Sequence, residues 1–218
     1  MTGTSLYDMP EYYDIAFSWD ISLELDIIEA AFERYAAGCV HHVLEPACGT
    51  GRFLVGLPRR GYRMTGYDVN PECVAFANRT VAAAGLTDRA RAVVADMRHA
   101  AFEERFDAAL NSINSIGHLL EDAEIVTHLR RTAACLRESG IYLVHLGCAH
   151  AHLDSGERSE WEIERDDVRV RTTWYVEKED HQRKISHHVC LMDISDRGRP
   201  VIFEEHPVSY THLRAHET

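Results

Sequence analysis

The sequence predicts a doubly wound α/β domain followed by an antiparallel β meander, and three observations support this prediction. Short apolar strands alternate with helical segments through about residue 147. A glycine-rich turn, Gly49-Thr50-Gly51, joins the first of these strands to the next helix. After residue 147 apolar and polar residues alternate instead. Strands separated by helices form βαβ units with a parallel sheet, whereas strict alternation indicates antiparallel strands with one drier face.

Helical periodicity first appears in the segment 21–37, which ends at Gly38. Asn70 and Pro71 open a second helix that we expect to reach about Ala84, because proline is tolerated in the first helical turn. A third helix is expected over 121–138, ending at Ser139-Gly140, with an apolar inner face of Ile125, Leu129, Ala133 and Leu136. The predicted parallel strands are 41–46, 62–68, 91–96, 106–113 and 141–146.

The segment 160–206 contains no convincing helix and is expected to form the meander. Val168, Val170, Thr172, Trp174 and Val176 alternate with mostly polar residues, and further strand-like runs cover 185–194 and 200–205. We therefore divide the chain into an α/β domain with an N-terminal helical segment, residues 1–147, and a strand-rich cap or insertion, residues 148–207.

The composition is that of a globular protein with a small-molecule partner rather than a nucleic acid. The 218 residues are 45% hydrophobic, which is enough for one domain with a substantial core. The formal net charge of -12 disfavours a nucleic-acid backbone as partner. No apolar run is long enough to cross a membrane, and the N-terminus does not resemble a secretory signal. Six scattered cysteines without a CxxC pair are typical of a cytoplasmic protein with free thiols.

The final segment, 208–218, reads VSYTHLRAHET and resembles one reading frame of a transposase adapter used to prepare sequencing libraries. This resemblance predicts that the biological sequence stops near Pro207 and that the tail carries no functional residue. A natural basic tail is the alternative.

The segment LEPACGTG, residues 44–51, predicts a close approach of backbone to a ligand beside the start of a helix. Dinucleotides and S-adenosylmethionine are both bound by such turns. The dinucleotide pattern places glycine or alanine at a third position, where this chain has Leu54, and a leucine there is expected to crowd the packing of the helix on the strand. Asp68 ends the next strand and is suited to accept hydrogen bonds from both hydroxyls of an adenosine ribose, although it could also be a simple turn residue.

The succession HVLEPACGTGRF, YDVNPECV and ADMR resembles the motifs of class I S-adenosylmethionine-dependent methyltransferases over about residues 41–147. The resemblance implies a Rossmann-like methyltransferase sheet with the meander inserted after strand five. The YYD segment, the NSINSIGHL stretch and the strand-rich region resemble the branch that methylates small molecules, including sugar N-methyltransferases.

The resemblance also assigns cofactor-binding residues. Glu45 would approach the methionine amino group, and Gly49 and Gly51 would let the backbone pass the methionyl portion. Ala47 lies in the same loop, although Pro46-Ala47 departs from the family's usual residues. The ribose, the adenine and the region near the sulfonium are assigned to Asp68, to Asp96 with Met97, and to Asn111, respectively.

Methyl transfer depends mainly on positioning, and a base is needed only where the acceptor loses a proton. His118 and Asn111 are the catalytic candidates, and His145 is a second candidate base. Tyr13 and Trp19 are candidates to close over the cofactor, because aromatic faces attract a sulfonium as they attract other cations, with helix packing as the alternative.

Two further expectations complete the sequence-based interpretation. His145, Cys148, His150, His152 and Asp154 include metal-ligand types, but no matching second cluster follows, so we expect no metal site. The family's sheet normally has seven strands, the last two after a final helix. An ending near Pro207 would leave strand five as an exposed edge.

The predicted function is therefore S-adenosylmethionine-dependent methylation of N or O on a small molecule. An NAD(P)-dependent oxidoreductase and a non-catalytic fragment that binds an adenosine cofactor are the alternatives. The sequence assigns no oligomeric state.

Overall fold

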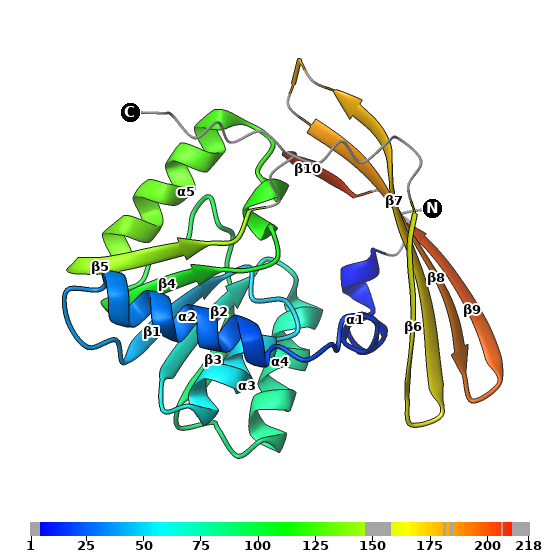
Figure 1. Ribbon diagram of the computed structural model, residues 1–218, viewed down its shortest axis with the longest axis horizontal. Coiled ribbons are helices and arrows are strands. Elements are labelled where there is room, and N and C mark those ends of the chain that lie inside the picture. Colours follow the sequence, from blue (N-terminus) through cyan, green and yellow to red (C-terminus); the bar gives the residue numbers. More distant parts are fainter. Residues whose placement is uncertain (1–4, 147–157, 181, 184, 206, 211–218) are drawn as a thin grey trace. The chain divides into compact units, whose positions relative to one another are not determined.

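The computed structural model describes residues 5–146, 158–180, 182–183, 185–205 and 207–210 (Figure 1). The chain forms two compact units. The α/β unit comprises Trp19–Ile116 and Asp122–His145, and the meander unit comprises Met1–Ser18, Gly117–Glu121 and Leu146–Thr218. Each unit has a hydrophobic core of its own.

The α/β unit is built on a five-stranded parallel sheet ordered β3-β2-β1-β4-β5. Its strands are β1 (His42–Pro46), β2 (Arg63–Asp68), β3 (Ala90–Val94), β4 (Phe106–Asn111) and β5 (Leu136–Val144). Its helices are α2 (Ser22–Tyr35), α3 (Arg52–Arg59), α4 (Pro71–Ala83) and α5 (Asp122–Cys135), and the 3-10 turn η2 (Ser115–His118) follows β4. The predicted α/β domain and its order of elements are confirmed.

Helices cover both faces of this sheet. Successive side chains of a strand point to opposite faces, so neighbouring residues of one strand enter different cores. In β1, Val43 packs into a core with residues of α2, α3 and α4, whereas Leu44 packs into a second core with Cys135 of α5 and Tyr67 of β2. The strand order reverses between β1 and β4, and the carboxyl ends of strands at such a switch point form the ligand crevice of doubly wound folds.

The inner face of α5 differs from the predicted one. The buried residues are Ile125, His128, Thr132 and Cys135, whereas Leu129 is 40% exposed and Ala133 is also exposed. The helix is therefore rotated from the face that hydrophobicity favours. His128 accounts for part of this rotation, because its buried ring makes hydrogen bonds to the loop after β3 and to β5.

The end of α5 also differs from the prediction. The predicted stop at Ser139-Gly140 is wrong, because β5 begins at Leu136, directly after the helix. Phe106 of β4 pairs with Leu136, but Ala108 pairs with Ile141. The intervening residues of β5 are therefore accommodated in a bulge, and Ser139-Gly140 lies within it.

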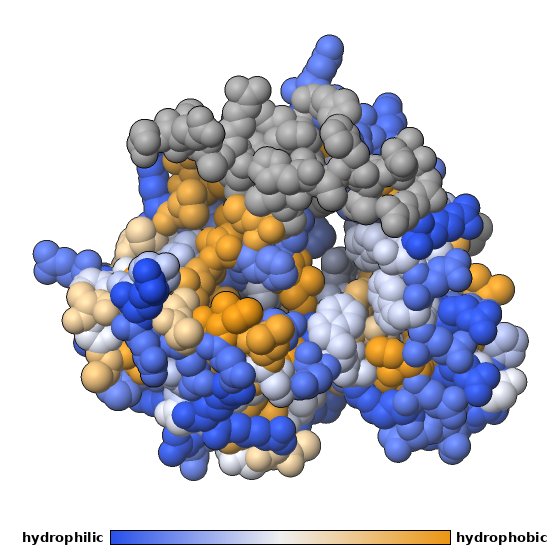
Figure 2. All heavy atoms as spheres, viewed as in Figure 1, coloured by the Kyte–Doolittle hydropathy of each residue, from blue (hydrophilic) through white to orange (hydrophobic). Residues whose placement is uncertain are grey.

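The meander unit contains η1 (Leu6–Asp8), α1 (Pro10–Ala16) and the strands β6 (Arg158–Arg165), β7 (Val168–Asp180), β8 (Ile185–Asp196), β9 (Arg199–Glu205) and β10 (Val208–Tyr210). All strand pairs are antiparallel, in the order β10-β8-β7-β6, with β9 also paired to β8. The predicted meander is confirmed, and β6 is an additional strand that was not among the predicted strand-like runs. The visible surface around these strands is mostly hydrophilic (Figure 2). The ion pairs Arg169–Glu164 and Arg171–Glu162 join charged side chains of β6 and β7.

The drier face of the meander packs against the N-terminal segment. Ile15, Ala16 and Phe17 share a core with Val170 and Met192. The indole Nε1 of Trp161 donates to the carbonyl oxygen of Ala16 at 2.7 Å.

Among the described residues, β5 pairs only with β4 in the first sheet, and the later strands form the second sheet. This agrees with the predicted edge position of strand five. Val208–Tyr210, at the start of the segment assigned to the adapter-like tail, pairs with β8. No described helix has the length and apolar character needed to cross a membrane.

Candidate cofactor-binding site

The turn after β1 has the open backbone that the glycine motif predicts. Ala47, Gly49 and Gly51 all have positive φ angles, of 53°, 51° and 85°. The Gly51 N–H donates to the Cys48 carbonyl oxygen at 2.9 Å, and Gly51 is the N-cap of α3. A Cβ on Gly49 would meet nothing within 4 Å, so its side of the loop is open to a ligand. Ala47 adopts the left-handed region without being glycine, which is a strained conformation of the type found at ligand loops.

Asp68 connects this turn to the end of β2. Its Oδ2 accepts from the Gly49 N–H at 2.9 Å, and its Oδ1 accepts from the Asn70 N–H at 2.9 Å. An ionised carboxylate has about four lone-pair sites, which suits it to accept hydrogen bonds from ribose hydroxyls. The structure thus brings Asp68 to the glycine turn, as the ribose assignment requires.

Leu54 is accommodated because a glycine lies opposite it in β2. Leu54 is fully buried, and a Cβ on Gly66 would lie 2.9 Å from its Cδ1 and 2.8 Å from the Cβ of Cys48. The close helix–strand contact therefore depends on Gly66, and not on a glycine or alanine at position 54. Because Gly66 provides the space, Leu54 does not crowd the contact between helix and strand. The leucine nevertheless still differs from the glycine or alanine of the dinucleotide pattern.

Glu45 lies at the carboxyl end of β1 with its side chain buried at 1% exposure. Its Oε1 accepts from the Ser112 hydroxyl at 3.3 Å, whereas Oε2 has no hydrogen-bond partner among the described residues. Burial raises the pKa of Glu45 to about 8, with hydrogen bonding to Ser112 and the charge of Arg52 acting in the opposite direction.

An orphaned buried carboxylate oxygen is costly and requires a partner. The ammonium group of S-adenosylmethionine would provide one, and the residues of this turn therefore fit that cofactor. When bound, S-adenosylmethionine supplies a methyl group on a positively charged sulfur. Gly49 and Gly51 of the turn, with Glu45 at the end of β1 and Asp68 at the end of β2, are the residues that would hold it.

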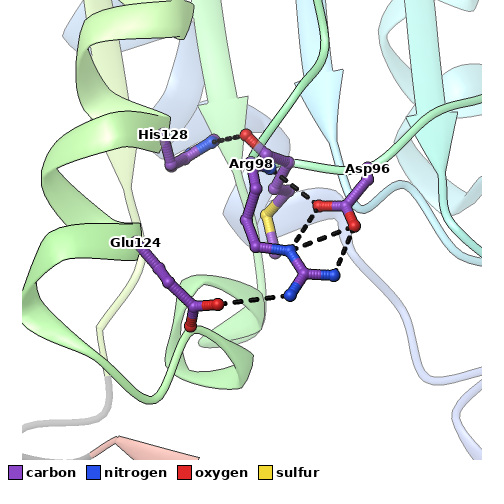
Figure 3. Close-up of polar contacts among 5 residues, drawn as sticks. Asp96, Arg98, Glu124 and His128 are labelled. Atoms are coloured by element: carbon purple, nitrogen blue, oxygen red, sulfur yellow. Dashed lines mark hydrogen bonds and ion pairs between the residues drawn. The ribbon is translucent and has the colours of Figure 1, made fainter.

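Asp96 follows β3 and is held by Arg98. Arg98 Nε lies 3.0 and 3.1 Å from the two Asp96 oxygens, and Nη2 donates to Oδ2 at 2.5 Å (Figure 3). Hydrogen bonding to Arg98 lowers the pKa of Asp96 to about 2. The carboxylate is therefore ionised and can only accept hydrogen bonds, which suits the exocyclic amine of adenine.

Met97, the residue after Asp96, lies beside Asn111. The Asn111 amide nitrogen donates to the Pro46 carbonyl oxygen at 3.1 Å and lies 4.0 Å from the Met97 sulfur. Its Oδ1 accepts from the Ile116 N–H at 2.8 Å. Asn111 therefore links the ends of β1 and β4 to the residue assigned to cover the adenine ring.

Two further candidates belong to the meander unit. Tyr13 forms an aromatic row with Tyr7 and Phe17, at centroid separations of 5.5 and 4.6 Å. His118 Nε2 lies 3.3 Å from the Tyr7 hydroxyl oxygen. Tyr13 and His118 are thus brought near the same side chain, Tyr7, and their roles toward the cofactor and the acceptor stay predictions.

The remaining candidates from the sequence have other partners or lie outside the described residues. The Arg52 guanidinium lies 4.8 Å from the centroid of the Trp19 ring, so a protein cation already occupies a face of this ring. The backbone N–H of exposed His145 donates to the Asn111 carbonyl oxygen at 2.9 Å. Cys148, His150, His152 and Asp154 fall in the segment 147–157, which the structure does not describe. The described residues contain no group of three or more potential metal ligands.

Sequence reasoning did not single out Ser112, Arg98, Glu124, His128 or Tyr142. Arg98 could have been found from its position two residues after Asp96. The others are brought to the site by tertiary contacts that leave no local pattern in the sequence.

The sheet order, the glycine turn after β1 and the acidic residue after β2 define a Rossmann-like domain for an adenosine-containing cofactor. Residues 43–140 match the family described as "Methyltransferase domain". Residues 43–140 of this chain are therefore assigned to a methyltransferase domain, in agreement with the resemblance of the sequence motifs to those of class I S-adenosylmethionine-dependent methyltransferases.

Comparisons with individual proteins agree with this assignment. A Bacillus subtilis protein named as a methyltransferase, YqeM, is 28% identical over 102 residues, which are 46% of this chain and 40% of YqeM. The RNA methyltransferase RlmD of Acidithiobacillus ferrooxidans is 31% identical over 106 residues, 45% of this chain and 24% of that protein. The chain spans less than half the length of the curated relatives it matches.

Solved structures extend the similarity of the fold to nearly the whole chain. DesVI of Streptomyces venezuelae has a TM-score of 0.80 at 19% identity, covering 94% of this chain and 85% of DesVI. The sugar N-methyltransferase KedS8 of Streptoalloteichus has a TM-score of 0.77 at 20% identity, covering 97% of this chain and 80% of KedS8. The fold that these proteins share includes the strand-rich region after β5.

Proposed function

We propose that the protein transfers the methyl group of S-adenosylmethionine to a nitrogen or oxygen atom of a small molecule. The observation that carries this proposal is the buried carboxyl group of Glu45, whose Oε2 has no hydrogen-bond partner among the described residues. It lies at the start of the turn whose Gly49 N–H donates to Asp68, the residue assigned to the ribose. A dinucleotide presents pyrophosphate, not an ammonium group, to such a turn, so Glu45 favours S-adenosylmethionine over the oxidoreductase alternative.

The residues of the α/β unit act by positioning and electrostatics. Asp68 would fix the ribose, Asp96 and Met97 the adenine, and Glu45 the ammonium group, which together would fix the direction of the methyl group. Asn111 would hold the ends of β1 and β4 in register near the reacting atoms. Orientation of the acceptor in line with the methyl group supplies much of the rate in such a reaction.

His118 is the proposed proton acceptor. An amine acceptor that gained the methyl group would have to release a proton. The His118 imidazole would receive this proton, with the Tyr7 hydroxyl at 3.3 Å orienting the ring. Tyr13, in the aromatic row with Tyr7, is the proposed aromatic contact of the cofactor.

A small amine, such as an aminosugar, is the acceptor class to test first. Among the structurally similar proteins, KedS8 is named a sugar N-methyltransferase and CalS10 an amino pentose methyltransferase. RlmD, by name, acts on RNA, but this chain carries a formal net charge of -12, which disfavours a nucleic-acid partner. We infer a cytoplasmic location, consistent with the free thiols of Cys39, Cys48, Cys73, Cys135 and Cys190.

The full chain should be incubated with S-adenosylmethionine labelled in the methyl group and a panel of aminosugars, other amines, phenols and alcohols. We expect label to enter an amine or hydroxyl acceptor, and His118→Ala to reduce the rate by about 10²-fold with cofactor affinity retained. Tyr7→Phe keeps the ring but removes the hydroxyl, and its loss should be smaller. A chain that binds the cofactor and methylates no member of the panel would favour the non-catalytic alternative.

A further inference from the structure

Helix α5 presents a buried polar side chain to the loop that contains Asp96 and Met97. His128 is 0% exposed; its Nδ1 lies 3.2 Å from the Met97 carbonyl oxygen and its Nε2 lies 2.7 Å from the Tyr142 hydroxyl oxygen. A carbonyl oxygen can only accept, so Nδ1 carries the proton and donates it to Met97. Nε2 of a neutral ring then accepts from Tyr142.

The surroundings keep this arrangement in one protonation state. Burial lowers the pKa of His128, which favours the neutral ring that Nε2 needs in order to accept. Burial likewise raises the pKa of Tyr142, so the phenol keeps its proton and donates. A buried imidazole with both nitrogens satisfied fixes its own orientation, and hence that of the group to which it donates.

A second attachment starts one turn earlier on the same helix. Glu124 Oε1 accepts from Arg98 Nη1 at 3.2 Å, and the remainder of the Arg98 guanidinium holds the Asp96 carboxylate (Figure 3). Glu124 and His128 are four residues apart and therefore lie on one side of α5. Figure 3 shows both side chains directed from the helix toward the loop.

We propose that α5 positions the adenine-binding corner, Asp96 and Met97, through these two attachments, and that His128 is the positioning residue for Met97. The proposal rests on the proposed function, because it assumes that this corner receives adenine. Met97 is then held at both ends, its carbonyl by His128 and its sulfur beside the Asn111 amide. An apolar residue at position 128 could fill the same space, but it could not fix the Met97 backbone.

Two substitutions separate the two hydrogen bonds of His128. The amide nitrogen of asparagine superimposes on Nδ1 of histidine, whereas that of glutamine superimposes on Nε2. His128→Asn therefore retains the donor to Met97 and loses the partner of Tyr142. His128→Gln can accept from Tyr142 through its amide oxygen, once the amide group is rotated, and loses the donor to Met97.

Binding of S-adenosylhomocysteine to the full chain should be measured by calorimetry, alongside the thermal midpoint of each variant. We expect His128→Gln to weaken binding by about tenfold and His128→Asn by less than about threefold, although both variants lose thermal stability. Equal affinities, or equal losses, in the two variants would overturn the positioning role and leave His128 a packing residue.

Glu124→Gln provides a second arm that does not alter the core. The substitution removes the negative charge that pairs with Arg98, and we expect binding of S-adenosylhomocysteine to weaken about threefold. The control is Glu103→Gln, the same change at an exposed carboxylate elsewhere, which should leave binding unchanged. If the His128 variants do not fold, this pair decides, and equal affinities would overturn the proposal. A wild-type chain that is folded but does not bind S-adenosylhomocysteine would overturn the proposed function itself, whereas wild-type binding with unaffected variants overturns only the role of α5.

Discussion

At the scale of single residues, Glu45 links the fold to the proposed chemistry. In the folded protein burial raises the pKa of Glu45 to about 8, whereas the ordinary pKa of a glutamate is 4.5. The folded state thus binds more protons than the unfolded state between these values. The stability of the unliganded protein should therefore fall, through this group, as the pH rises from about 4.5 through 8.

Binding of an ammonium group beside Glu45 should reverse this preference and release the proton. At pH 7 we expect binding of S-adenosylhomocysteine to release close to one proton per molecule, because an adjacent positive charge favours the carboxylate. Calorimetry in buffers with different enthalpies of ionisation measures this number. Glu45→Gln cannot ionise and should bind more weakly without proton release. The same proton release in Glu45→Gln as in wild type would show that another group is responsible.

A second prediction for a single residue concerns the Asp96 carboxylate. Arg98 keeps its carboxylate ionised and therefore unable to donate a hydrogen bond. S-inosylhomocysteine, which has a carbonyl in place of the adenine amine, should bind at least about tenfold more weakly than S-adenosylhomocysteine, because two acceptors would face each other. Asp96→Asn should reduce this discrimination, since an amide can both donate and accept. Equal discrimination in the two proteins would argue against a contact between Asp96 and the base.

At the scale of elements, the contact of α3 with β2 depends on a glycine in the strand. Gly66→Ala would place a Cβ 2.8 Å from that of Cys48 and 2.9 Å from Leu54 Cδ1. We expect the substitution to lower the free energy of unfolding by about 1–3 kcal/mol and to weaken cofactor binding, because Cys48 is part of the turn. Gly38→Ala is the control, since an added Cβ there meets nothing within 4 Å. Urea unfolding of the two variants checks this prediction, and equal stabilities would refute it.

Gly66 and the buried face of α5 show why the sequence predicted some features of the fold and not others. The strands before Asp68 and Asn111 are apolar runs bounded by turn residues, and local pattern is enough to place them. Leu54 looked incompatible with a tight contact because its compensating glycine lies in a different element. Hydrophobicity alone predicted that Leu129 lies on the buried face of α5. In the structure His128 lies on that face, because it forms hydrogen bonds with Met97 and Tyr142. Such partners cannot be read from a periodicity.

The candidate site follows the same division. The glycine turn and Asp68 could be predicted, because the motif specifies a turn between a strand and a helix and an acid at the end of the next strand. The link between Asp68 and the Gly49 N–H, and the burial of Glu45 beside Ser112, required the three-dimensional structure. The ligand contacts assigned to these residues, and the roles assigned to Tyr13 and His118, stay predictions.

At the scale of the whole molecule, residues near the two ends of the chain meet in the meander unit. Glu205 of β9 accepts from the Ser5 hydroxyl at 2.9 Å and from the Leu6 N–H at 2.7 Å. Leu6 itself is buried in the core that includes Phe203. The N-terminal segment thus covers part of the meander and is held to it by a charged acceptor.

Removing this acceptor should loosen the N-terminal segment selectively. We expect Glu205→Ala to increase amide hydrogen exchange in residues 5–9 by about tenfold, the effect of losing a hydrogen bond to a charged group. Glu160→Ala removes an exposed carboxylate from β6 and serves as the control. Unchanged exchange in residues 5–9 of Glu205→Ala would show that apolar packing alone holds the segment.

The most direct test of the cofactor assignment is calorimetric binding of S-adenosylhomocysteine to the full chain, with NAD as the competing ligand. Asp68→Asn removes the charge that the ribose would meet, and Asp88→Asn makes the same change at an exposed position. We predict micromolar binding that is retained in Asp88→Asn, weakened at least about tenfold in Asp68→Asn, and absent for NAD. A folded protein that binds NAD and not S-adenosylhomocysteine would contradict the account.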